Sequence, residues 1–466
     1  LMRSVKIKGS SFLNILIVIS YLSPPFIGAY AWIQMLGRQG VITQFLNDTF
    51  GLHYGGVYGF VGIVLVFTLQ SFPLVYIYVS GALKNLDNSL NEAAESLGCS
   101  RMGRIWKIIV PLVMPTLLAS SMLVFMRVFA DFGTPMLIGE GYKTLPVLIY
   151  NQFMGEVSGD DGFAAAICCI VIGLTIVMFF VQRFLAGRNT YAMTALKPMA
   201  AESLSGLRNI LAHLAVYMVV GLAILPQFVV VYTSFLATNG GQVFTGGFAL
   251  QSYDATLFAK DNDVIWHTYF LGLCAIAAVL VLGVLIAYLS VRKRNTLNSI
   301  LDVITMFPFI IPGSVLGIAF VFAFNKSPII LTGTALIMII SFAVRRMPYT
   351  VRSSTAILGN ISPSIEEAAI SLGASDMTTF RKITVPMMMP GVLSGAIMSW
   401  VTIISELSSS IILYTNSTQT LTVSIYTEVI RGNYGNASAY ATILTVTSIL
   451  SLLLFYKVTG RRDVSV

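Results

Sequence analysis

The sequence predicts an all-α, polytopic helical membrane protein built from two parallel-repeat halves. Three observations predict this fold class: the composition, a series of long apolar segments and an internal repeat. Of the 466 residues, 56% are hydrophobic and only 10% are charged, and the mean hydropathy is +0.82. Such values lie outside the range of water-soluble domains.

The apolar segments are long enough to cross a hydrocarbon layer of about 30 Å as helices. They are continuous rather than alternating in polarity, which favours helices over barrel strands. The sequence predicts ten spans, at residues 12–34, 56–83, 112–138, 163–187, 207–236, 265–291, 297–325, 329–357, 387–414 and 436–458.

Basic residues in the short loops predict the orientation of the chain. Arg292, Lys293 and Arg294 lie between two predicted spans, and Arg461 and Arg462 follow the last one. If these residues are cytoplasmic, the alternation of spans places residues 85–118 and 360–393 on the cytoplasmic side too. The net charge of +8 then reflects the inside bias of a membrane protein, not a nucleic-acid-binding surface.

Residues 85–118 return, without a gap, as residues 360–393, and seventeen of the 34 paired positions are identical. Both copies are polar segments in an apolar chain, so generic hydrophobicity does not explain the match. They have the same predicted direction across the membrane, which is typical of a parallel repeat. We expect a first half at 1–187, a cytoplasmic linker at 188–206 and a second half at 207–466. The second half has six predicted spans and the first has four, so we expect two further spans before residue 1 in the natural protein.

Each copy of the repeat contains signals for a short helix. Ser89 with Glu92, and Ser364 with Glu367, have the S-x-x-E spacing of a capping box. A glycine follows in each copy and is expected to end the helix in a left-handed conformation.

A second short helix is expected in each copy. Ser100 and Ser375 can cap its start, and it is expected to end near Pro111 and Pro386, where the membrane span begins. Each copy therefore predicts a helix-turn-helix on the cytoplasmic surface.

These residues resemble the pattern EAA-x3-G-x9-I-x-L-P of the permease subunits of type I ATP-binding cassette importers. Valine replaces the leucine of the pattern in both copies, at Val110 and Val385. The resemblance implies the type I permease fold in each half and two coupling helices that contact cytoplasmic ATPases. The coupling residues that it implies are Glu92, Ala93, Ala94 and Gly98 in the first copy and Glu367, Ala368, Ala369 and Gly373 in the second.

Longer phrases, at 23–32 and 130–139, are similar to the fused, two-halves-in-one-chain permeases of ferric iron importers. That resemblance implies an importer in the bacterial inner membrane that moves ferric iron by alternating access. It also implies two copies of an ATPase subunit, which hold ATP and Mg, and a periplasmic substrate-binding protein. Thiamine, 2-aminoethylphosphonate, polyamine and sulfate remain alternative substrates, and an ion-coupled secondary transporter remains the alternative class.

No chemistry of its own is predicted for the chain. It contains no GxxxxGK[ST] segment, nucleophile elbow or HExxH motif, and its four cysteines lack ligand spacing. We expect no catalytic residue, no metal site, no cofactor and no nucleic-acid partner, and membrane lipid around the spans.

Two acids occupy equivalent places in the repeat. Asp131 and Glu406 are expected in the outer part of the span that follows each motif, where an ionisable group is costly and suggests function. They would suit a cationic substrate, or they serve helix packing or gating. Five tyrosines near the predicted outer face offer the oxygen ligands that ferric iron prefers, although an interfacial aromatic belt is the better interpretation. They are Tyr142, Tyr150, Tyr426, Tyr434 and Tyr440.

Overall fold

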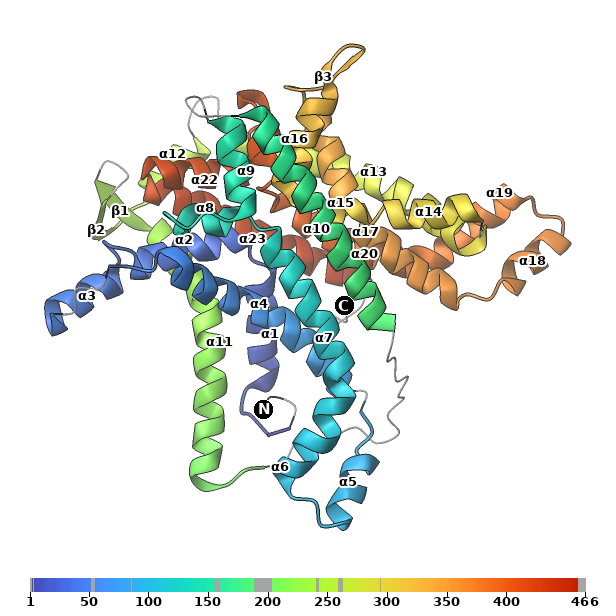
Figure 1. Cartoon of the computed structure of the whole chain (residues 1–466), viewed down its shortest axis with the longest axis horizontal. Helices are drawn as coiled ribbons and strands as arrows, with labels where there is room; N and C mark the ends of the chain where they lie inside the picture. The colour runs from blue at the N-terminus through green and yellow to red at the C-terminus, as the bar shows by residue number, and fades with distance from the viewer. Residues whose placement is uncertain are drawn as a thin grey trace. The chain divides into compact units, whose positions relative to one another are not determined.

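The computed structural model describes residues 2, 4–51, 55–84, 86–155, 160–187, 203–239, 243–258, 263–293 and 295–459. Most of the predicted linker, the first residue of the repeat at Asn85 and the basic residue Arg294 lie outside these ranges. The described chain is helical apart from two short antiparallel strand pairs, which confirms the predicted all-α class (Figure 1).

The chain forms two compact units. Unit 1 contains Leu1–Thr144 and Ile172–Val229, and unit 2 contains Leu145–Val171 and Val230–Arg462. The chain therefore passes between the units after Thr144, inside α10 (Asp161–Gly187) and near the end of α11 (Gly206–Ser234). The units cross the boundary between the sequence halves, because most of α11 belongs to unit 1.

The remaining elements of unit 1 are α1 (Ser10–Leu22), α2 (Pro25–Leu36), α3 (Val41–Phe50), α4 (Gly59–Lys84), α5 (Ser89–Ser96), α6 (Arg101–Arg104), the π-helical turn η1 (Ile105–Ile109), α7 (Val110–Phe129) and α8 (Gly133–Ile138). In its core, α11 packs against α1 through Ala212, Val216 and Val220. A second cluster joins α2, α4 and α8 around Trp32 and Ile138.

Unit 2 begins with α9 (Leu145–Met154), the strands β1 (Leu236–Asn239) and β2 (Val243–Phe248), α12 (Gln251–Leu257), α13 (Val264–Arg292), α14 (Thr296–Ile304), α15 (Phe307–Ile310) and α16 (Gly313–Phe324). It continues with β3 (Asn325–Lys326), β4 (Ile329–Ile330), α17 (Ala335–Asn360), α18 (Ser364–Ser371), α19 (Asp376–Thr379), the π-helical turn η2 (Phe380–Thr384) and α20 (Val385–Ile404). It ends with α21 (Ser410–Leu413), η3 (Asn416–Thr418), α22 (Leu421–Arg431) and α23 (Tyr434–Thr459).

The core of unit 2 is a three-helix contact among α13, α17 and α20. Its close approach depends on two glycines of α20. A Cβ on Gly395 would lie 2.5 Å from Thr350 Cα, and one on Gly391 would lie 2.7 Å from the Ser353 carbonyl oxygen. Side chains at these two positions would push α20 away from α17.

Seven helices are long and apolar enough to cross a membrane: Gly59–Lys84, Met102–Phe129, Asp161–Gln182, Gly206–Ser234, Val264–Arg292, Asp376–Ile404 and Tyr434–Leu454. Each matches one predicted span. The spans at 12–34 and 297–325 were predicted as single helices, and this is wrong. They are bent pairs, the second with an angle of 112°. Pro24 and Pro312 lie at the two breaks. Proline has no N–H and disfavours a helical conformation in the residue before it, so each proline interrupts the helix.

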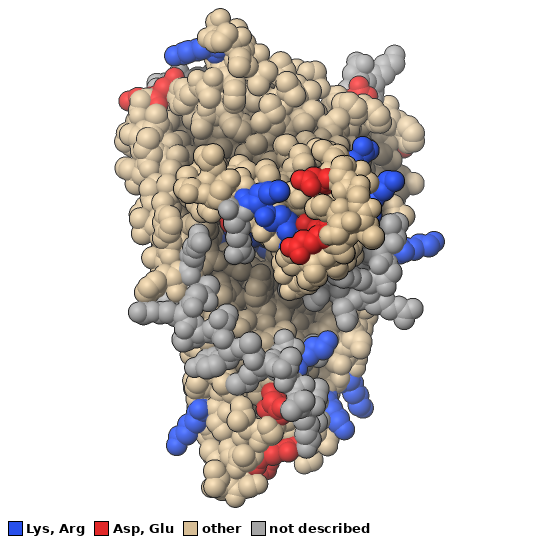
Figure 2. Space-filling model, turned by 90° about the vertical axis from the view of Figure 1, so that its right-hand side faces the viewer, with Lys and Arg blue, Asp and Glu red and all other residues tan. Residues whose placement is uncertain are grey.

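The tenth predicted span, at 329–357, corresponds to α17. This helix has 26 residues, which is long enough to cross, but it does not pass the apolarity criterion of the other seven. The reason is visible in its sequence, since every 18-residue window contains Arg345, Arg346 and Arg352. Elsewhere charge is sparse: on the face drawn in Figure 2, Lys, Arg, Asp and Glu form isolated patches on a largely uncharged surface.

Candidate functional site

The two copies of the repeated motif have the same helical elements. The bounds of α5, α6, η1 and α7 recur in α18, α19, η2 and α20 with a constant shift of 275 residues. In Figure 1, α5 and α6 lie beyond one end of α7, and α18 and α19 lie beyond the corresponding end of α20. The predicted helix-turn-helix is therefore present in both copies.

A glycine ends the first helix of each copy, as predicted. The φ angles of Gly98 and Gly373 are 79° and 90°, in the left-handed region. The N–H of Cys99 donates to the Ala94 carbonyl at 3.0 Å, and that of Gly98 donates to the Glu95 carbonyl at 2.9 Å. The second copy repeats both bonds, so each helix ends in a Schellman motif.

The predicted capping boxes are wrong. Ser89 and Ser364 are already the first helical residues, and neither helix has a side-chain cap at its N-cap residue. Instead Asp87 Oδ1 accepts the N–H of Ser89 at 2.9 Å, and Ser362 Oγ accepts that of Ser364 at 3.4 Å. The capping side chains lie two residues earlier than expected because each turn before the helix supplies a nearer acceptor.

The second helix of each copy starts where predicted but continues past its predicted end. Ser100 Oγ accepts the N–H of Gly103 at 3.2 Å, and Ser375 Oγ accepts that of Thr378 at 3.3 Å. The expected break near Pro111 and Pro386 is absent, since α6, η1 and α7 form one continuous helical run, as do their counterparts. The wider π-helical turn directly before each proline accommodates the residue that lacks an N–H.

The motif residues form an exposed surface. Glu92 and Ala93 are exposed in the first copy, as are Glu367 and Ala368 in the second. Ala94 is half-buried and Ala369 is buried against its own unit. Large apolar side chains stand out beside them at equivalent positions: Leu97 and Leu372 are 87% and 90% exposed, and Met102 and Met377 are both 64% exposed. The two copies therefore expose apolar side chains at matching places in a polar segment.

The two copies differ in the hydrogen bonds and ion pairs that attach them to the rest of their own units. In the second copy, Glu366 Oε1 accepts hydrogen bonds from Arg292 Nε and Thr384 Oγ1, each at 3.0 Å. Arg292 also donates to the Ile361 carbonyl at 2.9 Å. In the first copy, the ion pair is between Arg104 and the exposed Glu95.

The two acids lie just beyond the spans rather than within them. Helix α7 ends at Phe129 and α20 ends at Ile404, so Asp131 and Glu406 occupy the break before the next short helix. Each performs the same local task. Asp131 Oδ1 accepts the N–H of Thr134 at 2.9 Å, and Glu406 Oε1 accepts that of Ser409 at 3.2 Å.

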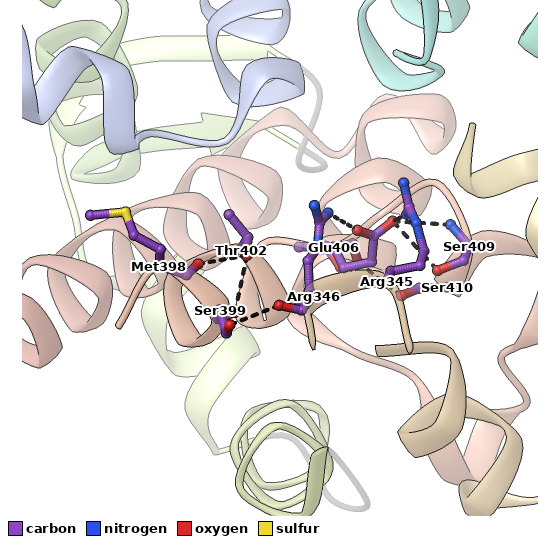
Figure 3. Close-up of polar contacts among 9 residues, drawn as sticks. Arg345, Arg346, Met398, Ser399, Thr402, Glu406, Ser409 and Ser410 are labelled. Carbon is purple, nitrogen blue, oxygen red and sulfur yellow. Dashed lines mark hydrogen bonds and ion pairs between the residues drawn. The ribbon is translucent and has the colours of Figure 1, made fainter. Parts of the chain in front are cut away.

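Glu406 also takes part in a cluster of charged side chains. Its carboxylate, 3% exposed, forms ion pairs with both Arg345 and Arg346 of α17 (Figure 3). The cluster contains two cations and one anion, and Ser409 Oγ also donates to Oε1. These interactions give Glu406 a packing role, and a contact with substrate stays a prediction.

Sequence reasoning missed the two arginines. A pair of adjacent arginines inside an otherwise apolar predicted span is itself a signal for a buried carboxylate partner. Glu406 was the available acid, but its pairing required knowing that α17 and α20 lie side by side.

Two of the five tyrosines have surroundings that disfavour the binding of a ferric ion. Tyr150 of α9 and Tyr426 of α22 lie outside the membrane-spanning helices, and burial raises the pKa of both phenols. A raised pKa disfavours the phenolate that would bind a ferric ion. Within the described ranges, no group of three or more His, Cys, Asp or Glu side chains could hold a metal ion.

The chain was compared with known protein families. The model of the family described as "Binding-protein-dependent transport system inner membrane component" matches residues 3–191 and 279–462. Each matched block contains one copy of the repeated motif, which agrees with the duplication seen in sequence and structure.

Individual relatives support the same assignment. The ferric transport system permease protein FbpB of Actinobacillus pleuropneumoniae is 32% identical over 454 residues, 95% of this chain and 65% of that protein. The putative ferric transport system permease protein FbpB 1 of Haemophilus influenzae is 31% identical, over 86% of this chain and 64% of its own length. The molybdenum transport system permease protein ModB of Escherichia coli is 28% identical over 38% of this chain. The chain thus spans slightly less than two thirds of the length of the two ferric relatives.

Proposed function

Because this chain belongs to the family of binding-protein-dependent transport system inner membrane components, we propose that it forms the pathway of an ATP-binding cassette importer for ferric iron. The observation that carries the importer assignment is the duplicated surface helix, α5 and α18, with its exposed leucine at Leu97 and Leu372. The names of two relatives that match most of this chain support ferric iron as the substrate.

The two surface helices suit two identical partners. Their backbones end in the same Schellman motif and present the same kinds of side chain, an acid followed by alanine and then an exposed leucine. Two copies of one cytoplasmic ATPase subunit would find equivalent contacts on them. ATP and Mg would be held by those subunits, and this chain would convert their movement into opening of one side of the membrane or the other.

The coupling residues are Glu92, Ala93, Ala94 and Gly98, with Glu367, Ala368, Ala369 and Gly373. Small residues at Ala93 and Ala368 allow a partner to approach the helix backbone. The glycines fix the angle at which the second helix leaves, because the left-handed conformation is costly for other residues. A displacement of α5 or α18 would then pass into α7 or α20 through the continuous helical run.

Substrate would reach the pathway from a periplasmic binding protein. This chain would contribute no covalent chemistry. The role of Asp131 in the pathway remains part of this proposal, and its side chain is half-buried.

An uptake experiment tests the substrate. A strain that lacks the chain should lose uptake of labelled ferric iron and regain it when the full-length protein is restored. Uptake of labelled thiamine, 2-aminoethylphosphonate, polyamine and sulfate is measured beside it. Loss of one of these in place of iron would assign that substrate instead.

A second experiment tests the mechanism. The chain should co-purify with an ATPase subunit, and substrate-loaded binding protein should stimulate ATP hydrolysis by the complex in liposomes. Transport by the chain alone under an ion gradient would establish the alternative class, a secondary transporter.

A further inference from the structure

A narrow polar pocket lies in unit 1 where helix α2 begins. Its walls come from α1, α2, α4, α7 and α11, and it has room for a water-sized group. Apolar helices contribute a high share of polar side chains to it: Ser20, Ser23, Trp32, Gln70, Arg127 and Gln227.

Three polar atoms of this lining have no hydrogen-bond partner in the part of the chain that the structure describes. They are Ser23 Oγ, Trp32 Nε1 and Gln227 Oε1, and all three are inaccessible to solvent. Trp32 as a whole is 4% exposed. Buried polar groups are almost always paired, because leaving them unpaired costs free energy, so these atoms point to a ligand or water.

The lining of the pocket includes one cation and, among the described residues, no acid. The guanidinium of Arg127 lies 5.0 Å from the centroid of the Tyr21 ring, and no ion pair joins it to an acid among the described residues. A cation in an apolar span is costly without an anionic partner. Ser23 and Pro24 also place the start of α2 at the pocket, and the first turn of a twelve-residue helix carries partial positive charge.

In the second repeat, a carboxylate of the chain itself lies beside the start of the comparable helix, α16. Gly313, the first residue of α16, lies directly against Arg345 and Ser408, and Arg345 pairs with Glu406. There the chain supplies its own carboxylate beside a helix N-terminus and an arginine. In unit 1 the position equivalent to Arg345 is Gln70, which lies over Gly28 of α2, and the equivalent acid is not among the pocket residues.

We propose that the pocket at the start of α2 binds an oxyanion, with one anionic oxygen inserted toward Arg127, Trp32 Nε1 and Ser23 Oγ. The available volume fits a single oxygen atom, so the rest of the anion lies at the pocket mouth. The ligand is a free oxyanion such as phosphate or sulfate, or the phosphate of an anionic lipid headgroup. This site does not depend on which substrate the importer carries.

Equilibrium dialysis of the purified full-length chain against labelled phosphate and labelled sulfate tests the proposal. We expect one saturable site per chain. Arg127→Met should weaken binding by about tenfold or more, because a charge-assisted contact is lost. Trp32→Phe, which keeps an aromatic ring but removes the N–H and part of the indole, should weaken it severalfold.

Arg38→Met is the matched control. Arg38 is also in unit 1 and its guanidinium also lies over a tyrosine ring, that of Tyr58 at 4.7 Å, but it pairs with Glu140 and is not in the pocket. Its loss should leave anion binding unchanged. Thermal unfolding of each variant identifies any that fail to fold, and Trp32→Phe keeps the test valid if Arg127→Met is one of them.

Two lipid compositions separate the sources of the anion. In nanodiscs of phosphatidylcholine, phosphate binding should persist. Its loss in nanodiscs of phosphatidylglycerol would identify the lipid headgroup as the occupant, and equal binding in both would identify the free anion. The proposal is overturned if wild-type protein shows no saturable binding of either probe, or if Arg127→Met and Trp32→Phe bind like wild type; the pocket would then hold only water.

Discussion

Asp131 and Glu406 occupy the same place in the two repeats and cap the following short helix in the same way, yet their surroundings differ. Glu406 is buried between two arginines of α17, whereas the positions equivalent to these arginines are Gln70 and Ser71 in α4. Capping of the following helix therefore does not require the arginine cluster, because Asp131 also caps it. The break between the long helix and the next short helix, which we call the joint, therefore holds a carboxylate in both repeats, but only the joint of Glu406 has arginines at the facing positions of the neighbouring long helix.

The largest expected effect comes from removing the charge at each joint. Glu406→Gln would leave Arg345 and Arg346 buried without their anion, and we expect it to lower the free energy of unfolding by about 3–5 kcal/mol. Asp131→Asn should change it by less than about 0.5 kcal/mol, since asparagine caps as well as aspartate. Denaturant unfolding of the detergent-solubilised chain measures both.

A charge-free variant is the control for this comparison. Arg345→Met, Arg346→Met and Glu406→Leu together should recover most of the lost stability, because no buried charge then remains unpaired. Equal losses for Glu406→Gln and Asp131→Asn would show that the arginine cluster does not distinguish the joints. Loss of uptake in Asp131→Asn at normal stability would instead assign Asp131 to the substrate pathway.

The glycine beside each joint sharpens the same comparison. A Cβ on Gly313 would lie 2.4 Å from Arg345 Nη1 and 2.6 Å from Ser408 Cβ, and the arginine is held by its ion pair. Gly313→Ala should therefore cost about 1–3 kcal/mol. A Cβ on Gly28 would meet only the end of the Gln70 side chain, at 2.5 Å, which can move aside. Gly28→Ala should cost less than about 1 kcal/mol in the same unfolding assay, and a cost as large as that of Gly313→Ala would contradict this interpretation.

The glycines of the motif test whether the two copies are equivalent in coupling. A Cβ added at Gly98 or Gly373 meets no neighbouring atom within 4 Å, so we expect the effect of valine to come mainly from the left-handed backbone and to be about 1–2 kcal/mol. We expect each change to loosen the turn and to reduce substrate-stimulated ATP hydrolysis severalfold. Gly359→Val, at an open position in α17 with ordinary helical φ, is the control. Normal substrate stimulation of ATP hydrolysis in both motif variants would show that the turn does not contribute to coupling.

Much of this fold could be predicted because its signals are local. The lengths of the apolar segments predicted the seven spans that are single helices, and Gly98 and Gly373 predicted the left-handed turns. Where a nearer partner competes, local signals fail: Ser89 has the capping-box spacing, but Asp87 provides the closer acceptor. The continuous helix through Pro111 likewise depends on a π-helical turn, which cannot be predicted from the spacing of residues.

The joints could be predicted only in part. Repeat alignment paired Asp131 with Glu406, but treated them as alike because it compares residues along the chain. Their difference arises from α17, whose arginines lie about 60 residues before Glu406 and reach it only when α17 and α20 pack together. The pocket of unit 1 is harder still, since its residues come from five helices and include Gln227 of α11.

The smallest expected effect concerns how each motif is fastened. Glu366→Gln removes the anion that Arg292 and Thr384 share, in a site where both ionic side chains are about one-tenth exposed. Glu95→Gln removes the partner of Arg104, but Glu95 is 64% exposed, so solvent screens that pair. We expect amide hydrogen exchange in α18 to quicken by about tenfold in Glu366→Gln, and exchange in α5 to change by less than about threefold in Glu95→Gln. The two motifs would then present similar surfaces to their partners, but α18 would be attached more strongly to its unit than α5 is to its own. An equal increase in exchange rate in both helices would show that the two attachments are equally strong.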